Sequence, residues 1–280
     1  MTLSQTLTWL AQQLPPEEAK LEAELLVQRA LGVKKTHLRT YPEQELTQTQ
    51  EDQLHAWLTR RQMGEPLAYI LGDTEFYGLT LSVSPSVLIP RQDTELLVDA
   101  ALDLIPESVP ARVLDIGTGS GAIAIAIASQ RPKALVSALD SSSAALTVAK
   151  DNACAHKLPA IRFYLSDWFS DLPTQQFDII VSNPPYIEND DVHLSQSSLP
   201  FEPAQALSSG QDGLDAIRLL CQQAPNWLAD NGWLLIEHGY NQGAAVRSLF
   251  TQARFNQVTT HRDYGNNDRI TLGQWNHTHA

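Results

Sequence analysis

Apolar residues recur at helical spacing through the first 72 positions of the chain. Four leucines mark one face of a first helix, which ends before Pro15-Pro16: Leu3, Leu7, Leu10 and Leu14. A second helix is predicted over 17–31, a third after the capping box of Thr47 and Gln50, and a short helical turn over 66–71. We therefore expect a small all-α domain over residues 1–72. It holds no cluster of catalytic residue types, so recognition of a substrate is its expected role.

The spacing changes to alternation between residues 75 and 83, around Tyr77 and Gly78. Alternating apolar and polar residues about a glycine turn predict a β-hairpin. We expect this hairpin to form a linker over residues 73–92.

Strand-like and helix-like segments alternate over residues 93–280. The predicted strands are 112–116, 135–139, 161–165, 177–182, 233–237, 255–260 and 269–275, and the predicted helices include 121–130, 143–156, 213–228 and 243–253. Strands separated by helices of this length form βαβ units, and the last two strands are close enough to pair antiparallel. The predicted fold class is α/β, with a mostly parallel sheet and an antiparallel C-terminal strand.

Charge and cysteine content narrow the possible functions. The net charge is −13, from 19 basic and 32 acidic side chains, and the acidic excess extends into the helical domain. Neither part offers a basic surface for duplex nucleic acid. Cys154 and Cys221 show no metal-binding spacing, and we expect both thiols to be buried. Because no secretion signal or membrane-spanning run is visible, we expect a cytoplasmic monomer that binds neither metal nor membrane.

A glycine loop follows the first strand of the α/β domain. Residues 113–122 read Val-Leu-Asp-Ile-Gly-Thr-Gly-Ser-Gly-Ala and lead from a strand into a helix. Glycines let the backbone approach a ligand, and a helix N-terminus presents N–H groups to negative charge. The pattern also fits a dinucleotide fingerprint with Asp140 placed for a ribose, so a nicotinamide oxidoreductase is one alternative.

Two further acids and an indole favour S-adenosylmethionine over a dinucleotide. Asp115 lies within the strand before the loop, where a carboxylate can hold an ammonium group, which a dinucleotide lacks. After the third strand, Asp167 and Trp168 supply an acid and an aromatic ring for adenine. Contacts for ammonium, ribose and adenine together predict a site for S-adenosylmethionine.

The sequence Asn183-Pro184-Pro185-Tyr186 directly follows the apolar strand 177–182. Ligands of open α/β sheets bind at the carboxyl ends of the strands, and the two prolines restrict the direction of the loop. The Asn oxygen and a Pro carbonyl form a paired acceptor for an NH2 group, and the Tyr ring can stack on a planar amide or base. We interpret this segment as the binding loop for a planar NH2 group.

With these motifs the chain resembles class I S-adenosylmethionine-dependent methyltransferases and, among them, the HemK/PrmC family. The resemblance covers nearly the whole chain. Its motifs are Ile89-Pro90-Arg91-x-Asp93-Thr94-Glu95, Phe201-Glu202-Pro203-x-x-Ala206-Leu207, Gly210-x-Asp212-Gly213-Leu214 and Glu237-His238-Gly239. It departs at Gln92, where the family often has a second proline. The resemblance implies a Rossmann-like fold and methylation of the glutamine N(5) in the Gly-Gly-Gln tripeptide of class 1 peptide chain release factors. It also implies that the helical domain contacts the release factor.

The motifs and the resemblance together assign roles to residues. Asn183, Pro184, Pro185 and Tyr186 would receive the glutamine amide. The cofactor-binding set would be Arg91, Asp115, Gly117, Thr118, Gly119, Ser120, Gly121, Asp140, Asp167, Trp168 and Asn183. The main alternative is a methyltransferase for the exocyclic amino group of adenine or guanine in nucleic acid, because the same loop suits a flipped base. A non-catalytic module that senses the cofactor is a third possibility.

Overall fold

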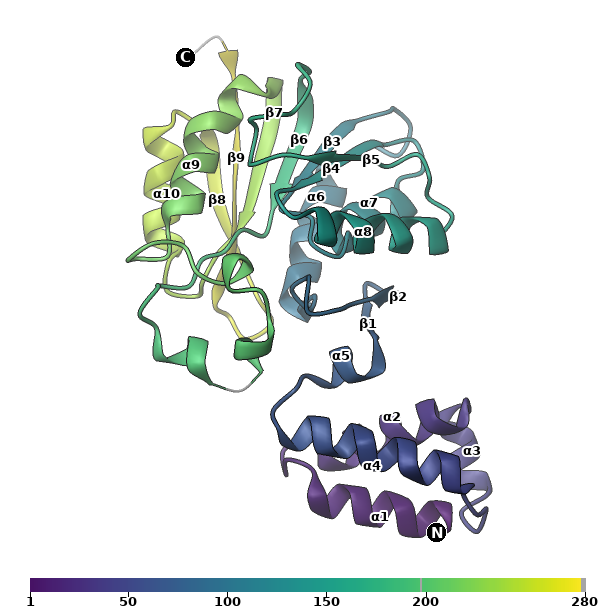
Figure 1. Ribbon diagram of the computed structural model, residues 1–280. Coiled ribbons are helices and arrows are strands. Elements are labelled where there is room, and N and C mark those ends of the chain that lie inside the picture. The colour runs from purple at the N-terminus through teal and green to yellow at the C-terminus, as the bar shows by residue number, and fades with distance from the viewer. Residues whose placement is uncertain (197, 278–280) are drawn as a thin grey trace. The chain divides into compact units, whose positions relative to one another are not determined.

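The structure is a computed structural model that describes residues 1–196 and 198–277. Its backbone packing divides the chain into two compact units (Figure 1). The first contains Met1–Asp73 with residues 198–201, and the second contains Thr74–Gln196 with residues 202–277. None of the helices in the described residues is long and apolar enough to cross a membrane.

The first unit is a bundle of helices around a leucine-rich core. Its helices are α1 (Leu3–Gln13), α2 (Ala19–Leu31), α3 (Lys35–Thr40), α4 (Gln48–Gln62) and α5 (Leu67–Leu71). The predicted helices are present, and the capping box of Thr47 and Gln50 begins α4 as expected. Helix α3 was not predicted, because a single polar turn of Lys-Thr-His-Leu-Arg-Thr carries no helical periodicity.

The second unit opens with the predicted hairpin and continues into a seven-stranded sheet. The hairpin strands are β1 (Asp73–Phe76) and β2 (Leu79–Ser82). The sheet strands are β3 (Arg112–Ile116), β4 (Leu135–Asp140), β5 (Arg162–Leu165), β6 (Phe177–Ser182), β7 (Leu228–Glu237), β8 (Asn256–Arg262) and β9 (Asp268–Gln274). Their order is β5-β4-β3-β6-β7-β9-β8, with parallel pairing from β5 to β7 and antiparallel pairing of β9 with both neighbours. The predicted mostly parallel sheet with an antiparallel C-terminal strand is confirmed.

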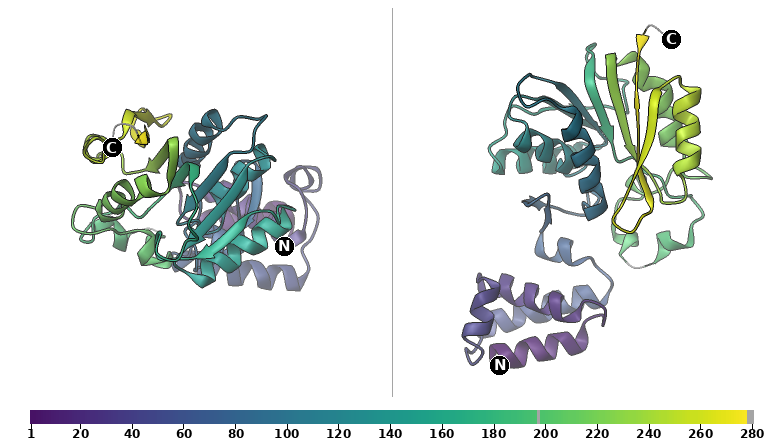
Figure 2. Two further views of the ribbon diagram at one scale, coloured as in Figure 1. Left: turned by 90° about the horizontal axis from the view of Figure 1, so that it is seen from above. Right: turned by 180° about the vertical axis from the view of Figure 1, so that it is seen from behind.

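Helices cover both faces of this sheet (Figure 2). They are α6 (Glu95–Leu104), α7 (Ala122–Gln130), α8 (Ser143–Ala155), α9 (Asp215–Gln223) and α10 (Gly243–Gln252). Val113 of β3 packs in one apolar cluster with α6 and α7, whereas Leu114 packs in the other with α9 and α10. Each of these fully buried side chains contributes about 1.5–3 kcal/mol through burial. Alternate residues of each strand thus build the two cores.

The chain reverses its winding direction between β3 and β6. Helix α7, which follows β3, belongs to one face, and α9, which follows β6, belongs to the other. β3 nevertheless pairs directly with β6. Such a switch point opens a crevice at the carboxyl ends of the two strands. The glycine loop and the segment that begins at Asn183 are the continuations of these strands.

Two sequence expectations differ from the structure. β7 begins at Leu228 rather than at residue 233. The prediction started too late because Asp230-Asn231-Gly232 has the composition of a turn, although it lies within the strand. The pairing of β7 with β6 is irregular there, between Phe177 and Ile179. Cys221 is buried as expected, but Cys154 is exposed. The prediction of two buried thiols is therefore wrong for Cys154, because the apolar sequence around it did not reveal which face of α8 it occupies.

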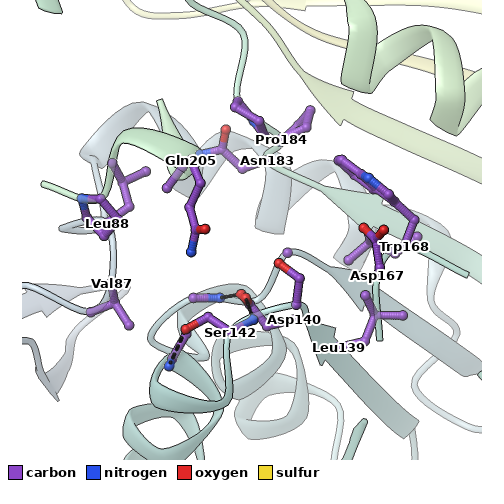
Figure 3. Close-up of a pocket in the computed structure, with 18 of the residues that line it drawn as sticks. Val87, Leu88, Leu139, Asp140, Ser142, Asp167, Trp168, Asn183, Pro184 and Gln205 are labelled. Carbon is purple, nitrogen blue, oxygen red and sulfur yellow. Dashed lines mark hydrogen bonds between the residues drawn. The ribbon is translucent and has the colours of Figure 1, made fainter. Parts of the chain in front are cut away.

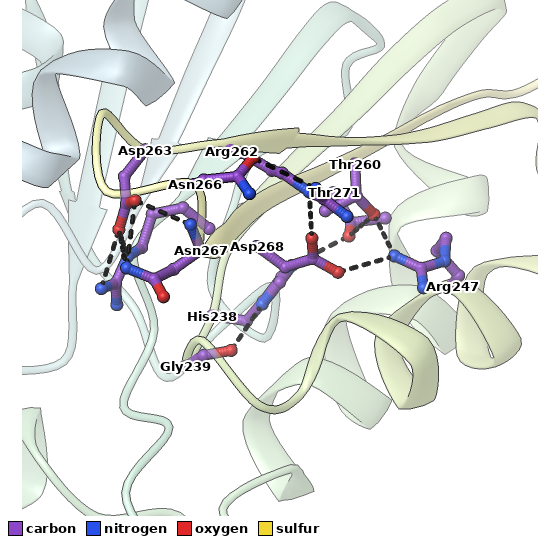
Figure 4. A network of polar contacts seen from close by, with 11 residues as sticks. His238, Gly239, Arg247, Thr260, Arg262, Asp263, Asn266, Asn267, Asp268 and Thr271 are labelled. Atoms are coloured by element: carbon purple, nitrogen blue, oxygen red, sulfur yellow. Dashed lines mark hydrogen bonds and ion pairs between the residues drawn. The ribbon is translucent and has the colours of Figure 1, made fainter.

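Polar contacts fasten the β8–β9 hairpin to its neighbours (Figure 4). Asp268 at the start of β9 pairs with Arg247 of α10 at 3.1 Å and with Arg262 of β8 at 3.0 Å. The ring of His238, just after β7, hydrogen-bonds through Nε2 to Thr271 Oγ1 at 2.9 Å. Burial lowers the pKa of His238, which favours the neutral imidazole. These contacts hold the carboxyl end of β7, and with it Glu237, in a fixed position.

Candidate active site

A cavity of about 260 Å³ lies at the carboxyl ends of β3, β4 and β6 (Figure 3). The cavity wall includes eight of the residues predicted for the site: Gly117, Gly119, Asp140, Asp167, Trp168, Asn183, Pro184 and Pro185. The other predicted residues, Arg91, Asp115, Thr118, Ser120, Gly121 and Tyr186, lie outside this lining set. The structure therefore brings most of the predicted residues into one cavity and places the rest behind its wall.

Asp140 holds the glycine loop in shape. Its Oδ2 accepts a hydrogen bond from the backbone N–H of Gly119 at 2.9 Å, and its Oδ1 accepts one from Ser142 N at 2.9 Å. Gly119 has a positive φ of 55°, a conformation that side chains other than glycine rarely adopt. At the end of the loop, a Cβ on Gly121 would lie 2.9 Å from Ile125 Cδ1. The loop thus needs glycine for its turn and for its packing.

Asp115 lies below this loop and is fully buried. Its Oδ2 accepts hydrogen bonds from Thr118 Oγ1 at 2.6 Å and Ala124 N at 3.2 Å. Its Oδ1 has no hydrogen-bond partner among the described residues. Burial raises the pKa of Asp115 to about 7, although its hydrogen bonds with Thr118 and Ala124 act in the opposite direction. A cationic group near Oδ1 would stabilise the ionised carboxylate.

Trp168 contributes an aromatic ring to the cavity from the loop after β5. Its backbone has a positive φ of 52°, which is unusual for a bulky side chain. The hydroxyl of the buried Ser166 stabilises this turn, because it donates to Trp168 O at 2.7 Å and accepts from Asp171 N at 3.0 Å. Local hydrogen bonds therefore offset the backbone strain at Trp168.

The Asn183-Pro184-Pro185-Tyr186 segment is anchored at three points. Asn183 Nδ2 donates to Thr94 Oγ1 at 3.1 Å, and Tyr186 OH donates to Glu237 Oε1 at 3.2 Å. The carbonyl oxygen of Tyr186 accepts from Gln242 Nε2 at 2.9 Å. Thr94 lies in a part of the chain distant from Glu237 and Gln242, which flank the turn between β7 and α10, so the position of the loop depends on the tertiary fold.

Glu237 is the charged group beneath this segment and is fully buried. Burial raises the pKa of Glu237 to about 7, while hydrogen bonds from Thr94 and Tyr186 and the positive charge of Arg269 act in the opposite direction. The Tyr186 hydroxyl has a raised pKa, chiefly through its own burial and also through the Glu237 charge. Tyr186 is therefore a neutral phenol that donates its hydrogen to the carboxylate.

Two segments that were not predicted complete the cavity. Ser86, Val87 and Leu88 line it from the segment after the hairpin, and Pro203, Gln205 and Ala206 line it from the loop after β6. Glu202 joins these two segments, because its carboxylate accepts from Ile89 N at 3.1 Å and pairs with Arg91. Arg91, which was expected at the cofactor, thus binds the buried Glu202 beside the cavity wall.

The loop that carries Glu202 is closed at its base. Ile187 and Ser208 form an isolated parallel bridge, and Asn189 N donates to Gly210 O at 2.9 Å. Gln205 projects from this loop into the cavity, on the side of Asp140 and Ser142 (Figure 3). The motif Phe201-Glu202-Pro203-x-x-Ala206-Leu207 spans Gln205 as an unspecified position, so it gave no indication of the direction of this side chain.

Comparison with known proteins places the chain among methyltransferases. Residues 5–72 match the PrmC N-terminal domain, and residues 92–210 match the methyltransferase small domain. The chain is 49% identical to the release factor glutamine methyltransferase of Pseudomonas aeruginosa over 94% of this chain and 95% of that protein. It is 46% identical to the enzyme of the same name from Escherichia coli over 92% of this chain and 93% of that protein.

Solved structures agree at the level of the fold. A methyltransferase from Pyrococcus furiosus aligns with a TM-score of 0.54 at 15% identity and covers 71% of this chain and 90% of its own. A 16S rRNA N2 methyltransferase from T. thermophilus aligns with a TM-score of 0.53 at 20% identity, over 72% of this chain and 49% of its own. These similarities confirm the Rossmann-like methyltransferase architecture.

Proposed function

Because the chain belongs to the family of release factor glutamine methyltransferases, we propose that it methylates the Gly-Gly-Gln glutamine of class 1 peptide chain release factors at N(5). It is an enzyme that uses S-adenosylmethionine to methylate a glutamine in a protein. The observation that carries the proposal is the position of Asn183 at the cavity wall, with its amide nitrogen bonded to Thr94. This leaves the amide oxygen of Asn183 as an acceptor for a ligand.

The side chains of the cavity fit S-adenosylmethionine. Asp140 uses one lone pair of each oxygen on a backbone N–H and keeps acceptor capacity for the two hydroxyls of a ribose. Leu139 and Trp168 offer apolar and aromatic surface for a purine. Asp115 lies outside the cavity lining, so its carboxylate would act on the ammonium group at a distance, from behind the glycine loop that it supports. When bound, the cofactor supplies an electrophilic methyl group on a positively charged sulfur.

The binding loop can orient the NH2 group of the substrate glutamine, which is the nucleophile. An amide nitrogen is a weak nucleophile, because its lone pair is delocalised into the carbonyl. Asn183 Oδ1 and the Pro184 carbonyl can each accept one N–H of the glutamine and so set the direction of the lone pair. Alignment of this kind can lower a barrier by roughly 7–11 kcal/mol. The methylated nitrogen then releases one proton to water, so no dedicated base is required.

We propose roles for the parts of the chain on the same basis. Residues 1–72 would recognise the release factor, residues 73–92 would link the two parts, and residues 93–280 would form the catalytic domain. The match of residues 5–72 to the PrmC N-terminal domain supports this division. The net charge of −13 supports a protein substrate over a polyanionic nucleic acid.

The test is transfer of a labelled methyl group to a purified class 1 release factor. The same factor with its tripeptide Gln replaced, a DNA duplex and ribosomal RNA are assayed in parallel. We expect label on the intact factor alone. Label on nucleic acid alone would contradict the proposed substrate and favour methylation of an exocyclic amino group, while label on the Gln-replaced factor would contradict the proposed atom.

A further inference from the structure

Two segments outside the sheet line part of the proposed cofactor cavity. The first is residues 86–88, after the β1–β2 hairpin, and the second supplies Pro203, Gln205 and Ala206 from the loop after β6. Neither segment is part of a strand or an α-helix. Regular backbone pairing therefore does not set the distance between them, and other contacts must do so.

Glu202 joins the two segments with both oxygens of its carboxylate. Its Oε2 accepts a hydrogen bond from Ile89 N at 3.1 Å, and its Oε1 pairs with the guanidinium of Arg91. Ile89 and Arg91 directly follow the first segment, and Glu202 directly precedes the second. Because the two oxygens bond to the same short stretch, both the direction and the reach of the Glu202 side chain are fixed.

The second segment is also held at its other end. Ile187 N donates to Leu207 O at 2.9 Å, and Ser209 N donates to Ile187 O at 2.9 Å. Residues 203–206 thus lie between a backbone anchor on one side and the Glu202 carboxylate on the other. Gln205 projects from this stretch into the cavity, on the side of Asp140 (Figure 3). The position of Gln205 therefore depends on both anchors.

The burial of this ion pair is unequal. The Glu202 side chain is 0% exposed, whereas that of Arg91 is 40% exposed. A buried carboxylate contributes little net stability, since an apolar side chain of the same size commonly serves as well. What it provides is direction, because its hydrogen bonds with charged and backbone donors have a defined geometry. The pair is thus suited to alignment of the cavity wall.

We propose that Glu202, with Arg91, is a positioning residue for the cofactor, which holds residues 86–88 and 203–206 at the separation that S-adenosylmethionine requires. The inference rests on the proposed function, since it takes the cofactor to lie in this cavity. Glu202 and Arg91 are both outside the cavity lining. They act through the wall residues and do not touch the cofactor.

The first test measures binding of S-adenosylmethionine to the full chain by calorimetry. Glu202→Gln keeps the size of the side chain, but its NH2 group would face a donor, since Ile89 N–H and the Arg91 guanidinium both donate. We expect the Kd to rise by about 5- to 20-fold, because the walls are no longer pre-organised. The KM for the cofactor should rise by a similar factor, while kcat and the KM for the release factor stay near wild type.

Asp178→Asn is the matched control. Asp178 also accepts from a backbone N–H and a guanidinium, both of Arg112 and both at 2.7 Å. This pair lies at the amino ends of β3 and β6, whereas the cavity lies at their carboxyl ends. The control should bind the cofactor like wild type. An unchanged Kd in Glu202→Gln, or an equal loss of affinity in Asp178→Asn, would overturn the proposal.

A double-mutant cycle with Arg91→Met decides whether Arg91 acts through Glu202. If it does, the double variant should bind the cofactor about as weakly as the weaker of the single variants. Losses of affinity that multiply would mean that Arg91 contacts the cofactor by itself, and would refute the pair as the positioning unit. Because Arg91 is the more exposed partner, Arg91→Met also tests the proposal if Glu202→Gln does not fold.

These binding measurements do not use the release factor. Wild-type protein that binds the cofactor but transfers no methyl group to the factor would contradict the proposed function. The cofactor affinities of the variants would still decide the role of Glu202.

Discussion

The carbonyl oxygen of Tyr186 fills the space that a Cβ atom on Gly213 would occupy. Gly213 has a positive φ of 70°, and a Cβ there would also lie 2.8 Å from Gln242 Nε2. Gln242 is the residue that donates to the Tyr186 carbonyl. Because Gly213 has no side chain, the Tyr186 carbonyl and the Gln242 side chain can meet beside it, and their hydrogen bond holds the binding loop in place.

In Gly213→Ala, the added methyl group should push the Tyr186 carbonyl and the Gln242 side chain out of position. We expect a fall in activity of about 10- to 100-fold and a loss of stability of about 1–3 kcal/mol, from the strained backbone and the disturbed loop. Gly78→Ala is the matched control, because Gly78 has a similar φ of 71° but nothing within 4 Å of the added Cβ. It should reproduce the backbone strain without the loss of activity. Equal activities for the two variants would show that Gly213 does not support the loop. Methyl transfer and thermal unfolding are the measurements.

Asn183→Ala removes the acceptor proposed for the glutamine amide. We expect the rate of methyl transfer at saturating cofactor to fall by about two orders of magnitude or more, while the circular dichroism spectrum stays close to wild type. Asn189→Ala, at an exposed position in the following loop, should leave the rate unchanged. Single-turnover assays with saturating cofactor separate this effect from binding. A rate near that of wild type would mean that Asn183 is misassigned.

Gln205 should act on cofactor binding. Its carboxamide reaches into the cavity toward Asp140 and Ser142, where the cofactor is proposed to lie. Loss of one hydrogen bond is worth about 0.5–1.5 kcal/mol, so Gln205→Ala should weaken binding of S-adenosylmethionine by roughly 3- to 10-fold. The KM for the release factor should change little. Calorimetry with Gln223→Ala as the exposed control tests this, and an unaltered affinity would exclude Gln205 from the cofactor site.

Cofactor affinity should depend on pH through Asp115. The pKa of its buried carboxyl is raised to about 7, so the carboxylate form grows as pH rises through neutrality. Because the negative charge behind the glycine loop would attract the positively charged cofactor at a distance, affinity should increase by up to roughly fivefold between about pH 6 and pH 7.5. Asp115→Asn should bind more weakly and lose most of this dependence. An equally steep dependence in the variant would assign the titration to another group.

The free enzyme should show the opposite trend in stability. Asp115 and Glu237 both have a folded-state pKa raised to about 7, so the folded state retains their protons longer than the unfolded chain. A group of this kind makes the free energy of unfolding fall as pH rises from about 4 to about 7. Thermal unfolding without cofactor should therefore occur at lower temperature at pH 8 than at pH 6. Asp115→Asn and Glu237→Gln together should flatten this difference.

Local patterns were sufficient to predict the sheet and the strand-end residues of the site. The strand 177–182 was predicted with its observed bounds, and Asp140 and Asn183 follow directly from their positions at strand ends. Strand periodicity and the connection rules act over short distances in sequence, which is why they suffice here. The extended start of β7 was missed because its pairing with Phe177, rather than its own sequence, maintains the strand through Asn231.

The contacts that complete the site depend on residues distant in sequence. Glu202 meets Ile89 across more than one hundred positions, and Thr94 meets Asn183 across almost as many. No periodicity links such pairs, so the sequence identified their motifs but not their partners. Arg91 illustrates the difference, because its motif was noted while its bond to Glu202 was not foreseen.

The bridge between Ile187 and Ser208 makes the geometry of the Asn183–Tyr186 segment independent of the length of the loop that follows it. With both ends joined, residues inserted between positions 190 and 200 would lengthen a closed excursion and would not pull on Tyr186. The entropy of closing such an excursion grows only slowly with its length. A change in the length of this segment is therefore expected to leave the position of Tyr186 unchanged.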